Sequence, residues 1–167
     1  MAATTSGTAT VTLPTDEEIL ITREFDAPRR LVYEAWTTPE LVKRWWAGKR
    51  GEVTSAEIDL RVGGTWRYVM VGHEGFEVAF HGEFREIVPN VRIVGTEVYE
   101  APEPEAMPDV EAPLTIVTFA ESGGRTTLTQ LMQCHTRQLR DMIIDSGMEG
   151  GMQESMDALE QVAISLR

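Results

Sequence analysis

One stretch decides the fold: REFDAPRRLVYEAWTTPELVKRWWAG, residues 23–48. Thr38 and Pro39 divide it, because threonine is a favoured N-cap and proline a favoured first helical residue. Each half carries apolar residues at helical spacing, and each run ends in tryptophan. These residues are Leu31, Val32, Ala35 and Trp36 in the first half and Leu41, Val42, Trp45 and Trp46 in the second. The stretch therefore predicts two short amphipathic helices in succession.

A strand is expected before these helices. Apolar residues alternate with polar ones over residues 17–25, which predicts a strand with one apolar face. Asp26 is expected to cap the first helix, with Pro28 in its first turn. Arg23 shares the apolar face of the strand, where an arginine either pairs with a carboxylate or contacts a polar group of a ligand.

The pattern after the helices changes to short alternating runs separated by glycine or Pro-Asn turns. They predict strands near 53–60, 64–72, 76–87, 91–99, 114–121 and 125–134. The short connections favour an antiparallel meander. Residues 100–113 are the exception, since they are rich in proline and acid; we interpret them as a solvated loop, with a lid over a site as the alternative.

The helical period returns after Cys134 and continues to the C-terminus. Gly147, Gly150 and Gly151 interrupt the apolar stripe, which predicts one long helix, either broken or kinked at the glycines. A polar outer face indicates that this helix lies with its apolar stripe against the sheet.

Length and composition indicate one domain. The chain has 167 residues, of which 42% are hydrophobic, enough to bury a core. Residues 1–15 carry no charge and no hydrophobic period, so we expect a disordered tail followed by a domain at 16–167. No apolar stretch approaches the ~20 residues that span a bilayer, and no secretory signal is evident, so we expect a cytoplasmic protein without membrane insertion.

The charge balance limits the partners. A net charge of −12 repels phosphate backbones and anionic lipids, which argues against nucleic acid as a partner. The single cysteine, Cys134, excludes an internal disulfide and a cysteine-based zinc site. We find no sequence motif of a nucleophile or a phosphate-binding loop.

Four segments carry a resemblance to a known family. They are residues 23–48, DLRVGGTWRYVM (59–70), HGEFREIVPNVRIVGTE (81–97) and SGMEGGMQESMDALEQ (146–161). Together they resemble the bacterial proteins similar to the C-terminal domain of the activator of Hsp90 ATPase, a family of the START-like, Bet v 1-like superfamily. The resemblance implies an α+β helix-grip fold, in which a curved antiparallel sheet of about seven strands surrounds the last helix and a cavity. That fold hosts lipid carriers, hormone receptors, aromatase/cyclases and co-chaperone domains, so it implies little about function.

Aromatic and methionine side chains on the predicted apolar faces suit the wall of such a cavity, because methionine adapts to varied apolar shapes and aromatic rings add rigid faces. The residues that we expect to line it are Trp45, Trp66, Tyr68, Met70, Phe80, Met132, Met148, Met152 and Met156. Arg23 is a possible polar contact to the ligand. His81, Glu83 and Glu77 share a strand face and could hold a metal, but we expect neither a metal nor a cofactor.

Three functions remain open at this stage. The favoured one is a module that binds a hydrophobic small molecule, as a monomer or homodimer. The second is a cyclase, aromatase or hydrolase in which Tyr68 or Arg23 polarises a substrate in the same cavity. The third is a protein-interaction module with the Trp45-Trp46 pair as a partly exposed anchor.

Overall fold

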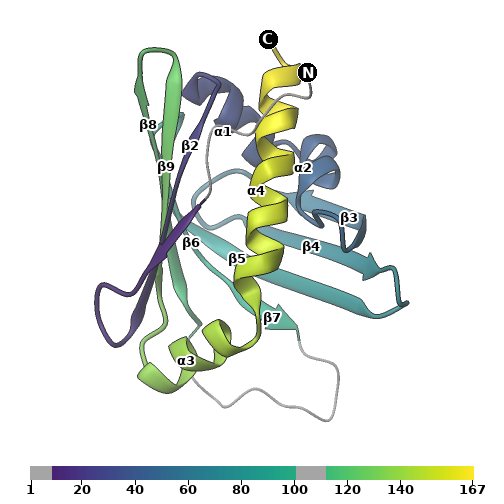
Figure 1. The fold of residues 1–167 in the computed structure, drawn as a ribbon, viewed down its shortest axis with the longest axis vertical. Helices are drawn as coiled ribbons and strands as arrows, with labels where there is room; N and C mark the ends of the chain where they lie inside the picture. The colour runs from purple at the N-terminus through teal and green to yellow at the C-terminus, as the bar shows by residue number, and fades with distance from the viewer. Residues whose placement is uncertain (1–8, 101–111) are drawn as a thin grey trace.

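The computed structural model describes residues 9–100 and 112–167 (Figure 1). Its helices are α1 (Arg29–Thr37), α2 (Pro39–Trp45), α3 (Arg137–Asp145) and α4 (Met148–Ser165). Its strands are β1 (Thr10–Thr12), β2 (Glu18–Phe25), β3 (Gly51–Ile58), β4 (Thr65–Gly72), β5 (Glu77–Val88), β6 (Arg92–Thr96), β7 (Val98–Glu100), β8 (Leu114–Ser122) and β9 (Arg125–Gln133). Among these residues, no helix is long and apolar enough to cross a membrane.

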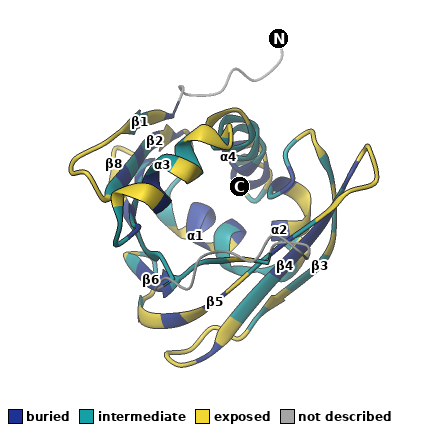
Figure 2. Ribbon diagram, turned by 90° about the horizontal axis from the view of Figure 1, so that it is seen from below, coloured by how far each residue is buried: buried dark blue, intermediate teal, exposed yellow. Residues whose placement is uncertain are grey.

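The described strands form one nine-stranded sheet with the order β1-β2-β9-β8-β6-β5-β4-β3, and β7 pairs with β5. Every pairing is antiparallel. The sheet curves around α4, and α1 and α2 pack at one end of that helix (Figures 1 and 2). The expected α+β helix-grip fold is confirmed.

The two short helices lie where the tryptophan-bearing stretch predicts them. Thr38 is the N-cap of α2 and Pro39 its first residue. The expectation for Asp26 is wrong, because α1 begins after Pro28 and has no side-chain cap. Asp26 instead donates its backbone N–H to a carboxylate oxygen of Glu160 on α4, 2.9 Å away.

Part of the expected tail belongs to the sheet. Residues Thr10–Thr12 form β1, which pairs with β2, so the expectation of disorder over 1–15 is wrong for these residues. Ala9 is buried and exchanges two backbone hydrogen bonds with the Gln153 amide on α4, at 3.0 and 2.7 Å. The apolar Val11 packs against the core and gives this short strand its place at the sheet edge. Residues 1–8 lie outside the described part.

The single strand expected at 91–99 is interrupted once, at Glu97. Phe84 pairs with Gly95 and His81 pairs with Val98, so one register against β5 runs through the interruption. This register places Glu97 opposite Gly82. A Cβ at Gly82 would collide with the Thr96 carbonyl oxygen and would come within 2.6 Å of the Trp66 indole nitrogen. The absence of a side chain at Gly82 therefore leaves room for both neighbours.

The C-terminal helical segment is broken, one of the two expected alternatives. Gly147 has a φ of 81° and forms the N-cap of α4, so α3 and α4 meet at an angle. Gly150 and Gly151 lie inside α4 and do not interrupt it. Most of the acidic segment predicted at 100–113 lies outside the described residues.

The C-terminal half of α4 is the half that the core anchors. Leu159, Val162 and Ala163 are buried there. The fully buried Arg23 side chain on β2 pairs with Glu160, also fully buried, at 3.2 Å and with the half-exposed Asp157 at 2.7 Å. Since Glu160 also accepts the Asp26 backbone N–H, one carboxylate joins α4 to both β2 and the start of the helix pair.

Removing the buried charge should cost more stability than removing the exposed one. We expect Glu160→Gln to lower the free energy of unfolding by about 3 kcal/mol, because Arg23 then keeps a buried charge with a weaker partner. The matched variant Asp157→Asn should cost less than about 1 kcal/mol, because water screens that pair. Urea denaturation measures both values, and equal losses would contradict this assignment of the anchor.

Candidate functional site

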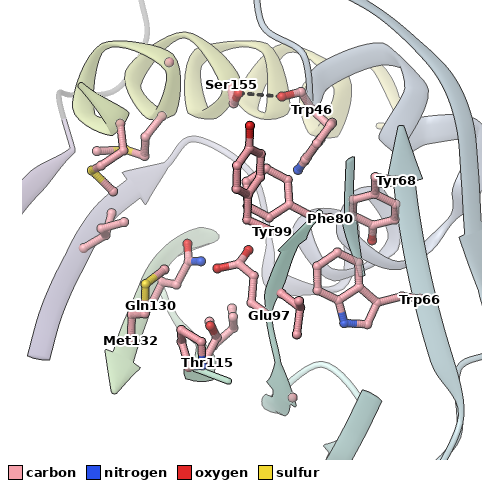
Figure 3. A pocket seen from close by; sticks show the side chains of 18 of the residues that line it. Trp46, Trp66, Tyr68, Phe80, Glu97, Tyr99, Thr115, Gln130, Met132 and Ser155 are labelled. Atoms are coloured by element: carbon pink, nitrogen blue, oxygen red, sulfur yellow. Dashed lines mark hydrogen bonds between the residues drawn. The ribbon is translucent and has the colours of Figure 1, made fainter. Parts of the chain in front are cut away.

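A cavity of about 840 Å³ lies between the inner face of the sheet and the N-terminal half of α4 (Figure 3). Strands β4, β5, β6, β8 and β9 supply its walls through side chains at alternating positions, because successive residues of a strand point to opposite faces. Helix α4 contributes Met148, Met152 and Met156, which are four residues apart and so share one helical face. The arrangement is a largely apolar space.

All nine side chains expected at a cavity wall lie around this one. Trp66, Tyr68 and Met70 come from β4, Phe80 from β5, Met132 from β9, Trp45 from α2, and Met148, Met152 and Met156 from α4. The structure thus brings together residues that are up to 111 positions apart in the sequence, from Trp45 to Met156. That they contact a ligand stays a prediction.

Aromatic rings form one continuous wall. The Trp46 ring lies edge-on to Tyr68 and Phe80, with centroids 5.5 and 5.7 Å apart, and the Trp66 and Tyr68 centroids are 4.9 Å apart. Phe80 in turn contacts Tyr99 at 5.2 Å. Because such contacts favour particular ring orientations, they hold this wall in a defined shape.

The two adjacent tryptophans have different environments, since Trp45 is buried and Trp46 is partly exposed. Trp45 is 4% exposed, and its indole N–H donates to the Ala35 carbonyl oxygen at 2.9 Å. Trp46 faces the cavity, and its carbonyl oxygen accepts a hydrogen bond from Ser155 on α4 at 2.8 Å (Figure 3). Of the pair, only Trp46 keeps part of its surface exposed, which weakens the interaction-module hypothesis.

Arg23 is not part of the cavity wall. It lies on the inner face of β2, as the alternation predicts, but at the level of the C-terminal half of α4, where Glu160 and Asp157 bind it. The Phe25 ring is also 5.0 Å from its guanidinium carbon. The expectation that Arg23 contacts a ligand is therefore wrong, and its side chain serves to dock α4.

Three polar side chains stand on the inner face of the sheet within the apolar cavity: Glu97, Thr115 and Gln130, here called the polar cluster. Figure 3 shows the Glu97 carboxylate directed into the cavity, on the side of Gln130 and facing away from Trp66. Among the described residues, no hydrogen bond or ion pair reaches the Glu97 carboxylate or the Gln130 amide, and the buried Thr115 hydroxyl has no partner. The described residues therefore leave the polar atoms of this cluster available to a ligand.

Burial raises the pKa of two side chains of the cavity wall, Glu97 and Tyr68. Glu97 is partly buried and keeps its remaining surface towards the cavity, and this loss of water raises its pKa to about 7. Burial also raises the pKa of Tyr68, and the nearby Glu97 carboxylate raises it further. Arg50 is the other charged side chain at the described wall; it is half-exposed and pairs with Glu154 at 3.6 Å.

The histidine considered for a metal lies outside the cavity. His81 is exposed on the outer face of β5, and its Nδ1 is 2.9 Å from the Glu100 carboxylate. Arg67 also binds Glu100, through two hydrogen bonds of 2.9 and 3.0 Å, and lowers the pKa of that carboxyl. Within the described part of the chain, no group of three or more histidine, cysteine or carboxylate side chains could hold a metal ion.

Comparison with known families identifies the architecture. Residues 26–163 match the family described as activator of Hsp90 ATPase homolog 1-like protein.

This chain belongs to that family.

The family lies in the START/Bet v 1-like superfamily, as the four sequence segments predict. A comparison with curated proteins found no match.

Solved structures share the fold of this AHSA1-like chain. A protein from Rhodobacter sphaeroides is 21% identical with a TM-score of 0.84, and the match covers 95% of this chain and 99% of that one. A protein from Nitrosomonas europaea is 24% identical with a TM-score of 0.78, covering 92% and 97%. An AHSA1-like protein from Aeromonas hydrophila is 21% identical with a TM-score of 0.63, covering 88% and 93%. At these identities the likeness shows the fold alone.

Sequence reasoning missed the whole polar cluster. The signal that could have found it is the alternation itself, since Glu97 shares a strand face with Ile93, and Gln130 shares one with Leu128 and Met132. A carboxylate or amide at such a position is the informative exception to an apolar face.

The raised pKa of Glu97 predicts how stability depends on pH. The folded protein holds the Glu97 proton up to about pH 7, whereas the unfolded chain releases it near the ordinary glutamate pKa of 4.5. This group's contribution to stability is therefore lost as pH rises between these values. Glu97→Gln does not lose stability in this way, because the glutamine side chain does not ionise. Its stability relative to wild type should therefore be higher at pH 8 than at pH 5, by about 2 kcal/mol.

Urea unfolding at the two pH values measures this difference. Glu74→Gln, in the exposed turn between β4 and β5, removes the same charge at the surface and serves as the control. The same wild-type-to-Glu97→Gln difference at both pH values would show that the Glu97 carboxyl titrates as an exposed one does.

Proposed function

We propose that this protein binds a small, largely apolar molecule in the cavity between its sheet and α4. The observation that carries the proposal is the cavity itself, whose volume of about 840 Å³ lies within the range of about 300–1,000 Å³ typical of ligand sites. Its wall combines apolar and aromatic side chains with a few polar ones, as such sites usually do.

Apolar contact would supply most of the affinity. Each 100 Å² of apolar ligand surface removed from water contributes about 2.5 kcal/mol before the costs of association. The aromatic wall offers a preorganised surface, because its rings already contact one another. The methionines of α4 face this wall from the other side and adapt to ligands of different shape.

Glu97 favours a second candidate function, acid–base catalysis on a neutral polyketide-like substrate in the same cavity. A carboxyl group with a pKa of about 7 is able to give and take a proton near neutral pH. With Arg23 bound to α4, Glu97 and Tyr68 are the side chains that support this reading. On such a substrate, Glu97→Gln should lower kcat by about 100-fold or more with little change in KM.

A larger side chain at Met152 should fill part of the cavity and weaken binding. For Met152→Trp we expect the dissociation constant of the neutral probe N-phenyl-1-naphthylamine to rise about tenfold, because the indole occupies space that the ligand needs. Probe fluorescence gives the affinity, and circular dichroism with urea denaturation shows that the variant is folded.

Gln161→Trp is the matched control, since Gln161 lies on the exposed face of the same helix, and it should bind the probe as wild type does. Met148→Trp provides a second cavity variant one turn earlier. Wild-type affinity in a folded Met152→Trp or Met148→Trp protein would contradict the proposed site.

A further inference from the structure

Among the described residues, the Glu97 carboxylate has no opposing charge in the cavity. Within the described residues no cation lies within ion-pair distance of it, and Arg50 is held by Glu154. An unpaired carboxylate among apolar side chains is costly, because the protein replaces its water shell with groups that cannot stabilise the charge. A ligand that carries a positive charge would offset this cost on binding.

The strand register places Thr115 between the other two members of the polar cluster. Gly95 on β6 pairs with Thr115 on β8, and Thr115 pairs with Met132 on β9. Glu97 lies two residues beyond Gly95, and Gln130 lies two residues before Met132. Because β6 and β9 run in the same direction, both are diagonal neighbours of Thr115 on the inner face but lie on opposite sides of it along the strands. In the view of Figure 3, the Glu97 carboxylate points towards the Gln130 amide.

The cluster matches the hydrogen-bonding needs of a primary ammonium group. Such a group has three N–H donors and no acceptor. Glu97 offers carboxylate oxygens, Gln130 its amide oxygen and Thr115 its unpartnered hydroxyl oxygen. No lysine or arginine of the described chain uses these acceptors.

We propose that the preferred ligands are apolar primary amines, whose ammonium group binds the Glu97 carboxylate, the Gln130 amide oxygen and the Thr115 hydroxyl while the apolar body contacts the aromatic wall. This proposal rests on the proposed binding function and names its ligand class.

Charge discriminates this class from others. An apolar carboxylate would place a second negative charge beside Glu97, which is unfavourable in a weakly screened cavity. An alcohol of the same skeleton would bind the apolar wall but leave the Glu97 charge uncompensated. The chain's net charge of −12 also attracts cations and repels anions at long range.

The protonation states of Glu97, Tyr68 and Cys134 at pH 8 follow from their pKa values. Tyr68 on β4 and Cys134 after β9 are the titratable groups whose pKa the Glu97 carboxylate raises, and burial raises the pKa of each as well. Both therefore stay neutral at pH 8. Tyr99 on β7 and Arg50 complete the titratable groups of the cavity wall. Glu97, with its pKa of about 7, carries a charge at this pH.

The test compares 1-naphthylmethylamine with 1-naphthalenemethanol, which share one apolar body. Isothermal titration calorimetry at pH 8 and 0.15 M salt gives both affinities for wild type, Glu97→Gln and the surface control Glu74→Gln. We expect wild type and Glu74→Gln to bind the amine at least about tenfold more tightly than the alcohol. The reason is that only the amine forms a hydrogen-bonded ion pair with Glu97. Glu97→Gln should lose this preference.

Equal affinities in wild type, or a preference that persists in Glu97→Gln, would overturn the amine assignment. Failure of the amine to bind would also overturn it. The neutral probe N-phenyl-1-naphthylamine separates the two proposals: if the probe binds, the apolar site stands and only the amine assignment fails, whereas absence of probe binding counts against the site itself.

Discussion

The pairing of Arg23 with Glu160 sets the position of α4, and the rest of the architecture depends on that position. Both side chains are fully buried, so any placement of the helix that separated them would leave a charge without a partner in the interior. The same carboxylate accepts the Asp26 backbone N–H at the entrance to the helix pair. One residue of α4 is thereby tied to the first long strand and to the segment that leads into α1, which determines both where the helix lies and which of its faces points inward.

Anchoring one half of α4 leaves the other half to cover a space. Beyond Asp157 towards the N-terminus, the inward residues are methionines and Ser155 rather than the small and branched side chains that pack the anchored half. Gly147 ends the connection from α3 and lets α4 start in a new direction. The curved sheet then faces the helix across a cavity instead of packing against it, and the ring contacts of the aromatic wall keep that wall in place.

The polar cluster adds hydrogen-bonding groups and a titratable carboxyl to an otherwise apolar cavity. Glu97 stands at the one interruption of the β6–β7 ladder, opposite Gly82, which has no side chain. Its low hydration links three properties: a pKa near neutrality, a stability that falls as that carboxyl ionises, and an affinity for a partner that returns the lost interactions. The proposed amine binding and the alternative of acid–base catalysis would both use this carboxyl group.

The sequence by itself determined the order of elements and their inward faces, because periodicity and turn residues are local properties of the chain, and its resemblance to a known family implied the α+β helix-grip class. The methionine and aromatic residues that the sequence assigned to the cavity wall all lie there in the structure. The sequence did not determine that Arg23 meets Glu160, that residues 10–12 add a strand, or that Glu97, Thr115 and Gln130 share one space without partners. Those outcomes depend on contacts between segments far apart in the chain, and only the curvature of the sheet and the anchored end of α4 decide which polar side chains are paired and which are left facing the cavity.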